Sequence, residues 1–233
     1  MAVTAPPFTG FTREGIQFLA DLAANNDRAW FQPRKAAYER LLKEPMEALI
    51  AALAVRLAAN EIPLRADPKR SPFRIYRDTR FSADKSPYKT HLGATFPWQD
   101  DGAPADDNPH GNGGYFNFQP GEMYVGGGMW RPPKERLDAF RRLIVADPDR
   151  VRTALEDPGF LASFGTAQPD AALKRIPPGY PADHPMADLF RWKDIIFGRR
   201  LSDAEVLSRD LPDLLAGGYA AAMPVFRLLA TLH

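Results

Sequence analysis

The spacing of apolar positions is helical in the first part of the chain. Over residues 11–60, apolar side chains recur every three or four positions, as on one face of a helix. Thr12 and Asp27 each precede such a stretch and are suited to accept hydrogen bonds from the first helical N–H groups. Pro33 bends or restarts the helix, and Pro45 at a first helical position opens a third one. The pattern therefore predicts a helical segment.

From Ser71 the period of apolar positions falls to two, and β-branched and aromatic residues become frequent. Pro120 and Gly121 have the order that a type II turn requires at its two central positions, so a hairpin is expected around them. The predicted elements are strands over 73–81 and 89–96 with a polar loop at 82–88, a loop rich in Gly, Asp, Pro and Asn at 99–114, and a hairpin over 115–126.

The chain after residue 132 returns to helical spacing. Several of the expected helices begin at prolines, and Ser202–Glu205 matches a capping box. Pro224 is expected to kink the last helix. Residues 194–197 are expected to form an edge strand. The fold class predicted is α+β, with a central antiparallel sheet at about residues 72–127 between N-terminal and C-terminal helices. No linker or repeat interrupts the pattern, so we expect one domain over residues 1–233, helical over 11–60 and 132–233.

Composition removes several classes of protein from consideration. The 233 residues include 30 Lys and Arg, 29 Asp and Glu, 4 His and no Cys. Disulfide scaffolds, cysteine nucleophiles and cysteine zinc sites are therefore excluded. A net charge of +1 argues against binding to nucleic acid through general phosphate attraction. No histidine pair has metal-ligand spacing, and no leader or membrane-spanning run is recognised, so we expect a cytoplasmic protein without metal, cofactor or membrane partner.

The near-neutral total hides two charged blocks. Residues 65–91 hold eight Lys or Arg against three Asp, a net charge of +5. Residues 92–130 hold five acidic and no basic residues, a net charge of −5. Whether these blocks neutralise each other or leave cations available to a ligand is the main functional question that the sequence raises.

Strict alternation along the predicted strand 73–81 places Arg74, Tyr76 and Arg80 on one face, opposite Phe73 and Ile75. Asp78 of the same strand shares that polar face. Matching the apolar sides of neighbouring strands adds further residues to it: Lys89, His91, Tyr115, Asn117, Gln119, Glu122 and Tyr124. Arginine and lysine supply donors for carboxylate or phosphate groups, so the face is suited to an anionic ligand. The alternative is a solvated outer face with cross-strand charge pairs.

Other candidates lie around this face. Arg77 falls on the apolar side, so we expect either a structural ion pair or a position at the sheet end, pointing into a cleft. The loop that holds Lys85 and Tyr88 could cradle a phosphate, although it lacks the glycines of a P-loop. Trp130, after three glycines, could form a wall of the site, and Lys174 with Arg175 forms a second basic pair that either completes a site or is solvated.

The long central motif also resembles a known family. Residues 73–91, FRIYRDTRFSADKSPYKTH, followed by Pro120-Gly121-Glu122 and Gly126-Gly127-Gly128-Met129-Trp130, are similar to an uncharacterised family of bacterial and fungal proteins, a domain of unknown function. Further matches at 25–31 and 173–180 extend the resemblance over nearly the whole chain. It implies a single full-length domain and assigns no activity, cofactor or catalytic residue.

Three hypotheses remain open from the sequence. The first is a binding protein or enzyme for a small anionic molecule; the second is a module for nucleic acid or an acidic protein; the third is a structural motif neutralised by the acidic segment 100–122. Oligomeric state and reaction stay undefined. The candidate ligand-binding residues are Arg74, Tyr76, Arg77, Arg80, Lys85, Tyr88, Lys89, His91, Asn117, Tyr124, Trp130, Lys174 and Arg175.

Overall fold

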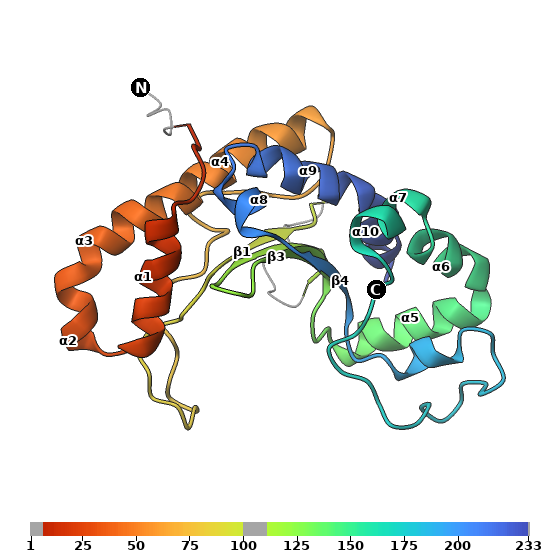
Figure 1. Cartoon of the computed structure of the whole chain (residues 1–233). Coiled ribbons are helices and arrows are strands. Elements are labelled where there is room, and N and C mark those ends of the chain that lie inside the picture. The colour runs from red at the N-terminus through yellow and green to blue at the C-terminus, as the bar shows by residue number, and fades with distance from the viewer. Residues whose placement is uncertain (1–6, 100–110, 233) are drawn as a thin grey trace.

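The computed structural model of the chain describes residues 7–99 and 111–232. Its helices and its four-stranded antiparallel sheet confirm the α+β class (Figure 1). The N-terminal part is helical, as predicted. It consists of α1 (Arg13–Ala24), α2 (Arg28–Phe31), the 3₁₀ turn η1 (Gln32–Arg34), α3 (Lys35–Tyr38), the π turn η2 (Glu39–Lys43) and α4 (Glu44–Ala59).

Both predicted N-caps of this helical part are confirmed. The Thr12 hydroxyl accepts a hydrogen bond from the N–H of Gly15 at 3.1 Å, and the Asp27 carboxylate accepts one from Trp30 at 2.8 Å. Pro33 lies in the 3₁₀ turn, because a proline removes one N–H group from an α-helical ladder. The chain is redirected there and continues into α4, which packs on the sheet.

The sheet has the strand order β1 (Leu92–Pro97), β2 (Gly113–Phe118), β3 (Tyr124–Met129) and β4 (Ile195–Arg200). The turn between β2 and β3 is of the predicted type, since Gly121 has φ +76° and the N–H of Glu122 donates to the carbonyl of Gln119 at 2.9 Å. The edge strand expected at residues 194–197 is β4, and it extends three residues further.

The strand predicted over residues 73–81 is wrong. This segment contacts β1 where the N–H of Phe73 donates to Gly93 at 2.8 Å, and then turns away. Farther along it pairs with the returning chain, through the N–H of Arg77 to Pro87 at 2.9 Å and the N–H of Lys89 to Ile75 at 2.7 Å. Because these contacts are isolated bridges rather than a ladder, the sheet begins at Leu92 and not near residue 72.

The C-terminal part supplies helices and the fourth strand. Its elements are α5 (Lys134–Ala146), α6 (Pro148–Leu155), α7 (Pro158–Phe164), the 3₁₀ turn η3 (Ala187–Arg191), β4, α8 (Asp203–Leu207), α9 (Leu211–Ala221) and α10 (Met223–Ala230). The capping box at Ser202–Glu205 is confirmed. Pro224 lies in the first turn of α10, and the helix expected to kink there is divided into α9 and α10. Asp210 precedes α9 without a side-chain cap.

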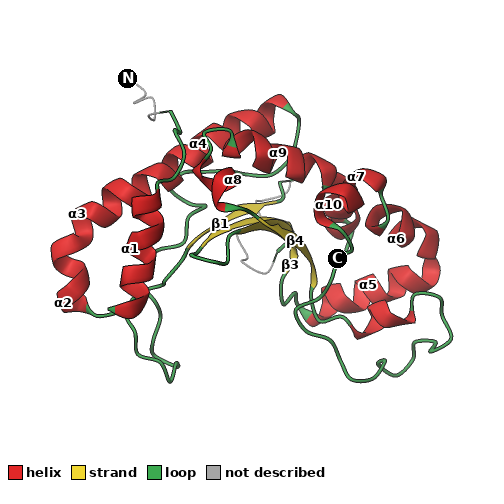
Figure 2. Ribbon diagram, in the orientation of Figure 1, coloured by secondary structure: helices red, strands yellow, loops and turns green. Residues whose placement is uncertain are grey.

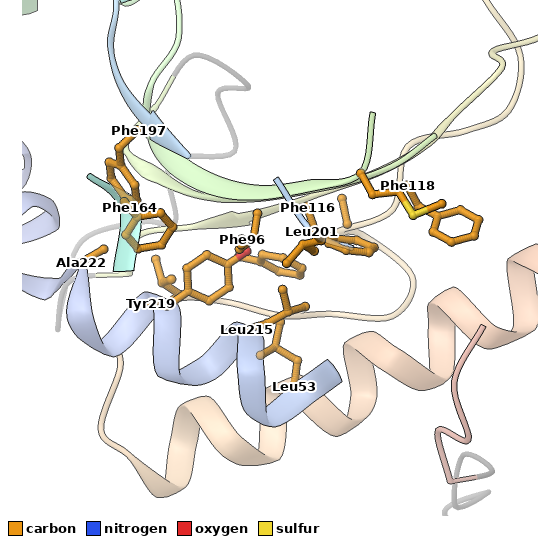
Figure 3. Close-up of a cluster of buried hydrophobic side chains, with 14 of the residues drawn as sticks. Leu53, Phe96, Phe116, Phe118, Phe164, Phe197, Leu201, Leu215, Tyr219 and Ala222 are labelled. Atoms are coloured by element: carbon orange, nitrogen blue, oxygen red, sulfur yellow. The ribbon is translucent and has the colours of Figure 1, made fainter. Parts of the chain in front are cut away.

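One face of the sheet carries the core. Helices α4 and α9 lie over this face (Figure 2), and Phe96, Phe116 and Phe118 project from the strands toward them (Figure 3). Gly114 lets the ring of Tyr219 approach the strand, because a Cβ there would lie 2.8 Å from that ring. The Tyr219 hydroxyl donates to the carbonyl of Tyr115 at 3.0 Å, which ties α9 to β2.

The opposite face, called the open face below, has no helix of the described residues lying over it (Figures 1 and 2). Helices α1–α3 stand at one side of the arch and α5 with α6 at the other, so the open face forms the inside of the arch. A sheet buried on one face and accessible on the other is typical of antiparallel sheets. The polar side chains that alternate with the core phenylalanines along the strands therefore lie on the face that these helices leave open.

Candidate functional site

Three polar side chains of β2 and β3 meet on the open face. Asn117 pairs with Tyr124 across the strands, and the rings of Tyr115 and Tyr124 are 5.4 Å apart. The Tyr115 hydroxyl donates to Asn117 Oδ1 at 3.2 Å, while Asn117 Nδ2 donates to the carbonyl of Glu122 at 2.6 Å. The sequence prediction that these residues share a face is confirmed, and their hydrogen bonds fix the orientation of Tyr115.

A cleft of about 1330 Å³ covers this face of the sheet. Pockets for small molecules usually measure about 300–1,000 Å³, so the cleft has room for a sizeable ligand. The described residues that line it include four arginines and two carboxylates, and one of the arginines, Arg199, is paired with Glu205 at 2.9 Å. Its charged and aromatic lining residues are Arg65, Arg70, Arg199, Arg200, Glu122, Asp170, Phe73, Tyr115, Tyr124, Trp130 and Phe164.

Cationic side chains gather where β1 meets the segment before it. Lys89 is half-buried with its Nζ 4.7 Å from the centroid of the Phe73 ring, and Phe73 is itself a wall of the cleft. Burial and the neighbouring Arg74 lower the pKa of Lys89. Burial and Lys89 in turn lower the pKa of His91. We call Arg74, Lys89 and His91 the cationic cluster; none of the three lines the cleft itself, and the cluster adjoins it through Phe73.

The cationic cluster has no ion pair with a carboxylate of the described residues. The acid that Arg74 influences is Asp78, whose carboxylate is held by Arg80 at 2.7 Å. Like charges that are partly buried together disfavour one another's charged forms. An anion bound between them would relieve this repulsion.

The lowered pKa of His91 predicts a stability change in mild acid. The unfolded chain takes up this proton near pH 6.5, whereas the folded chain takes it up only at lower pH. The free energy of unfolding should therefore fall as pH drops below about 6.5. His91→Gln should flatten that part of the profile, measured by urea unfolding between about pH 5 and 7. Equal slopes in the two proteins would contradict the assignment.

Comparison with protein families assigns the chain to a family but does not assign it an activity. Residues 14–227 match the family described as conserved hypothetical protein, DUF2461. The chain belongs to this family. The match spans the helices, the sheet and the cleft, in agreement with the resemblance of the central motif to an uncharacterised family. No curated protein and no solved structure matches this DUF2461 chain.

In this DUF2461 protein, the most basic part of the motif is held by local contacts. Arg77 forms an ion pair with Asp84 and also donates to the carbonyl of Ser86 at 3.2 Å. Arg80 is paired with Asp78 and its side chain is 77% exposed. Lys85 donates to the carbonyl of Thr79 at 2.9 Å. Of the two positions expected for Arg77, the structure shows the structural ion pair, and all three residues shape the loop rather than line the cleft.

Tyr88 is a core residue rather than an accessible ligand contact. It is 1% exposed, and its ring stacks on Phe31 with centroids 4.1 Å apart. Asn26 fixes its backbone, donating to the Tyr88 carbonyl at 2.9 Å and accepting from its N–H at 3.0 Å. Its bridge partner Tyr76 is 48% exposed. Of the predicted set, Tyr124 lines the cleft, Asn117 is buried and bonded to Tyr115, and the cationic cluster adjoins the cleft through Phe73, whereas Tyr88 belongs to the core.

The remaining predicted residues are Trp130, the basic pair Lys174 and Arg175, and the acidic segment. Trp130 is 42% exposed and lines the cleft, as expected for a wall. Lys174 and Arg175 are exposed and do not line it. Asp100, Asp101, Asp106 and Asp107, which were to neutralise the basic segment, lie outside the described residues, so only Glu122 of that acidic set can be placed.

Several cleft residues were not selected from the sequence. Phe73 was assigned to the apolar face, but its ring lies 6.1 Å from Tyr115 on the open face. This placement depends on Gly93, where a Cβ would lie 2.8 Å from the Phe73 ring. Arg200 was missed because β4 was expected to end at residue 197. Tyr115, in contrast, was placed on the polar face by the alternation of side chains along β2.

Within residues 7–99 and 111–232 no group of three or more His, Asp or Glu is arranged to hold a metal ion. Across the same part of the chain no helix has the length and apolar character needed to cross a bilayer.

Proposed function

We propose that this DUF2461 protein binds a small molecule with an anionic group in the cleft on the open face of the sheet. The observation that carries the proposal is the cationic cluster of Arg74, Lys89 and His91 beside Phe73, gathered without a carboxylate partner among the described residues. Arginine and lysine together suit phosphate or carboxylate, since both donate charge-assisted hydrogen bonds.

The tyrosines give the cleft a second kind of contact. Burial raises the pKa of Tyr115 and that of Tyr124, so both hydroxyls remain protonated at neutral pH. A protonated hydroxyl both donates and accepts hydrogen bonds, which suits the uncharged polar groups of a ligand. The cleft therefore combines an anion-binding end with a polar aromatic wall, which is the usual composition of a small-molecule site.

The two alternatives receive less support. A contact with nucleic acid or an acidic protein would use the loop around Phe81, which is 95% exposed. However, Arg77 and Arg80 of that loop are already paired with Asp84 and Asp78. The same pairs favour a structural role for this part of the motif, but they do not involve the cationic cluster.

A thermal-shift screen tests the proposal. Purified protein is heated with inorganic phosphate, pyrophosphate, citrate or, at equal ionic strength, sodium chloride. We expect pyrophosphate or citrate at saturation to raise the melting temperature by several degrees over chloride, because a ligand bound only by the folded state stabilises it. Isothermal titration calorimetry then gives the affinity. Identical melting curves in all four salts, with no heat of binding, would contradict the proposal.

A further inference from the structure

The open-face positions of β3 point to the shape of the ligand, an inference that rests on the proposed function. In order along the chain these positions are Tyr124, Gly126, Gly128 and, just past the strand, Trp130. All four line the cleft. Two aromatic side chains therefore bound a stretch of strand that has no side chain of its own on this face.

Glycines of the neighbouring strands widen this stretch. Gly126 is paired with Gly198 of β4, and Gly128 is paired with Gly113 of β2. We call these four residues the glycine floor. Tyr115 of β2 also faces Gly126, and Ile196 of β4 faces Gly128, so the four glycines form a diagonal band between these two side chains. From the spacing of residues and strands in a sheet, the band runs about 7 Å along the strands and about 10 Å across them. A fused two-ring system lying flat along this band would contact its peptide groups.

Packing of the strands explains part of the glycine floor but not all of it. A Cβ at Gly126 would lie 2.2 Å from the carbonyl oxygen of Phe197, and one at Gly128 would lie 2.1 Å from that of Ile195. Gly198 differs, because its Cβ would approach nothing closer than the Val125 carbonyl oxygen, at 3.1 Å, and the residue is exposed. Contact between the strands therefore gives the weakest reason for a glycine at position 198, and a glycine there leaves this part of the floor without a side chain.

Trp130 is held at the end of the floor by an unusual turn. Arg131 has φ +48°, a conformation that costs free energy for a residue with a side chain. Its N–H donates to Oδ1 of Asp194 at 2.6 Å, and Asp194 is only 1% exposed. The Arg131 guanidinium covers the Trp130 ring at 4.4 Å. A buried carboxylate thus stabilises the backbone that places an exposed indole at the cleft.

We infer that the ligand is a planar aromatic acid whose fused rings lie on the glycine floor, between the tyrosines and Trp130, with its acidic group toward Arg74, Lys89 and His91. Aromatic rings gain from the tyrosine and indole contacts beyond the apolar area that they bury. A saturated ring of the same size is puckered and lies flat on neither surface. The glycine floor therefore selects planar ligands.

Two matched acids test this in the unmodified protein. Naphthalene-2-carboxylate and trans-decahydronaphthalene-2-carboxylate have the same charge and carbon skeleton, and only the first is planar. We expect the planar acid to bind about 5- to 10-fold more tightly by calorimetry, from aromatic contacts alone. In NMR spectra, its ring current should shift the Hα signals of Gly126 and Gly198 upfield, a signature that the saturated acid does not produce.

A methyl group on the floor provides the second test. Gly198→Ala should remove most of the preference for the planar acid and leave pyrophosphate affinity unchanged, which also reports that the variant is folded. Gly217→Ala is the matched control, because Gly217 lies in α9 and a Cβ there would have no atom within 4 Å. This control should retain the full preference.

The outcomes separate the two proposals. If pyrophosphate binds but the two acids bind equally, or the glycine signals do not shift, the planar-ligand inference is overturned and the anion site stands. If neither pyrophosphate nor either acid binds, the anion site itself is overturned, and the inference falls with it. A preference for the planar acid that Gly198→Ala abolishes supports both.

Discussion

Replacing both Arg74 and Lys89 by alanine is expected to weaken pyrophosphate binding about 100-fold. Each charge-assisted hydrogen bond to a bound anion is worth about a 10-fold change in affinity or more, and the two side chains belong to one cluster. The melting temperature should change little, because Arg74 is exposed and Lys89 is only half-buried. Calorimetry on the double variant and on each single variant measures the effect.

The matched control removes the same charges elsewhere. Lys35 and Arg40 lie in the N-terminal helical part, where each is paired with an exposed glutamate. The double variant Lys35→Ala with Arg40→Ala should bind pyrophosphate within about 2-fold of the unmodified protein, since exposed charges at a distance are screened by salt. Equal losses in the two double variants would show that net charge rather than the cationic cluster binds the anion.

Local chemistry explains the parts of the fold that the sequence predicted. The type II turn needs a φ of about −60° at its second residue and a positive φ at its third. Pro120 and Gly121 meet these two requirements, and both lie within the four residues of the turn. The caps at Thr12 and Asp27 likewise bond to N–H groups three residues away. Elements whose determinants are this close in sequence can be identified without knowledge of the tertiary structure.

The segment 73–81 shows where such reasoning fails. Its alternation is that of a strand, yet its backbone bonds first to Gly93 and then to its own returning chain. The decisive residues are distant: the bare Gly93 admits the Phe73 ring to the open face, and Asn26, 62 residues away, fixes the backbone of Tyr88. Because periodicity reports only one chain segment, it could not show that long-range contacts override it.

The sequence likewise predicted some residues of the candidate site and missed others. Asn117 and Tyr124 were placed on the open face through alternation in strands that do form, whereas Lys89 lies before β1 and adjoins the cleft through the Phe73 ring. The missing cleft residues come from β4 and from the segment after α7, which joins the cleft only through the tertiary fold. Charge counting also could not separate Arg77 and Arg80, which have local acidic partners, from the cationic cluster.

Tyr88→Ala is expected to be the most destabilising of the substitutions considered, by about 3–5 kcal/mol. The phenol is 1% exposed and stacked on Phe31, so truncation leaves a cavity in the core between the motif and the N-terminal helices. In a chain of this size that loss corresponds to a melting temperature lower by about 10 °C. Urea unfolding and thermal denaturation both measure it.

Two substitutions isolate the cause of this loss. Tyr76→Ala removes a tyrosine at the partner position of the same bridge, but one that is 48% exposed, so it should cost less than about 1 kcal/mol. Tyr88→Phe keeps the ring and loses only a 3.4 Å contact between the hydroxyl and Gln32, so it should be nearly as stable as the unmodified protein. If Tyr88→Ala instead kept full stability and lost pyrophosphate binding, Tyr88 would be a ligand contact and its assignment to the core would be wrong.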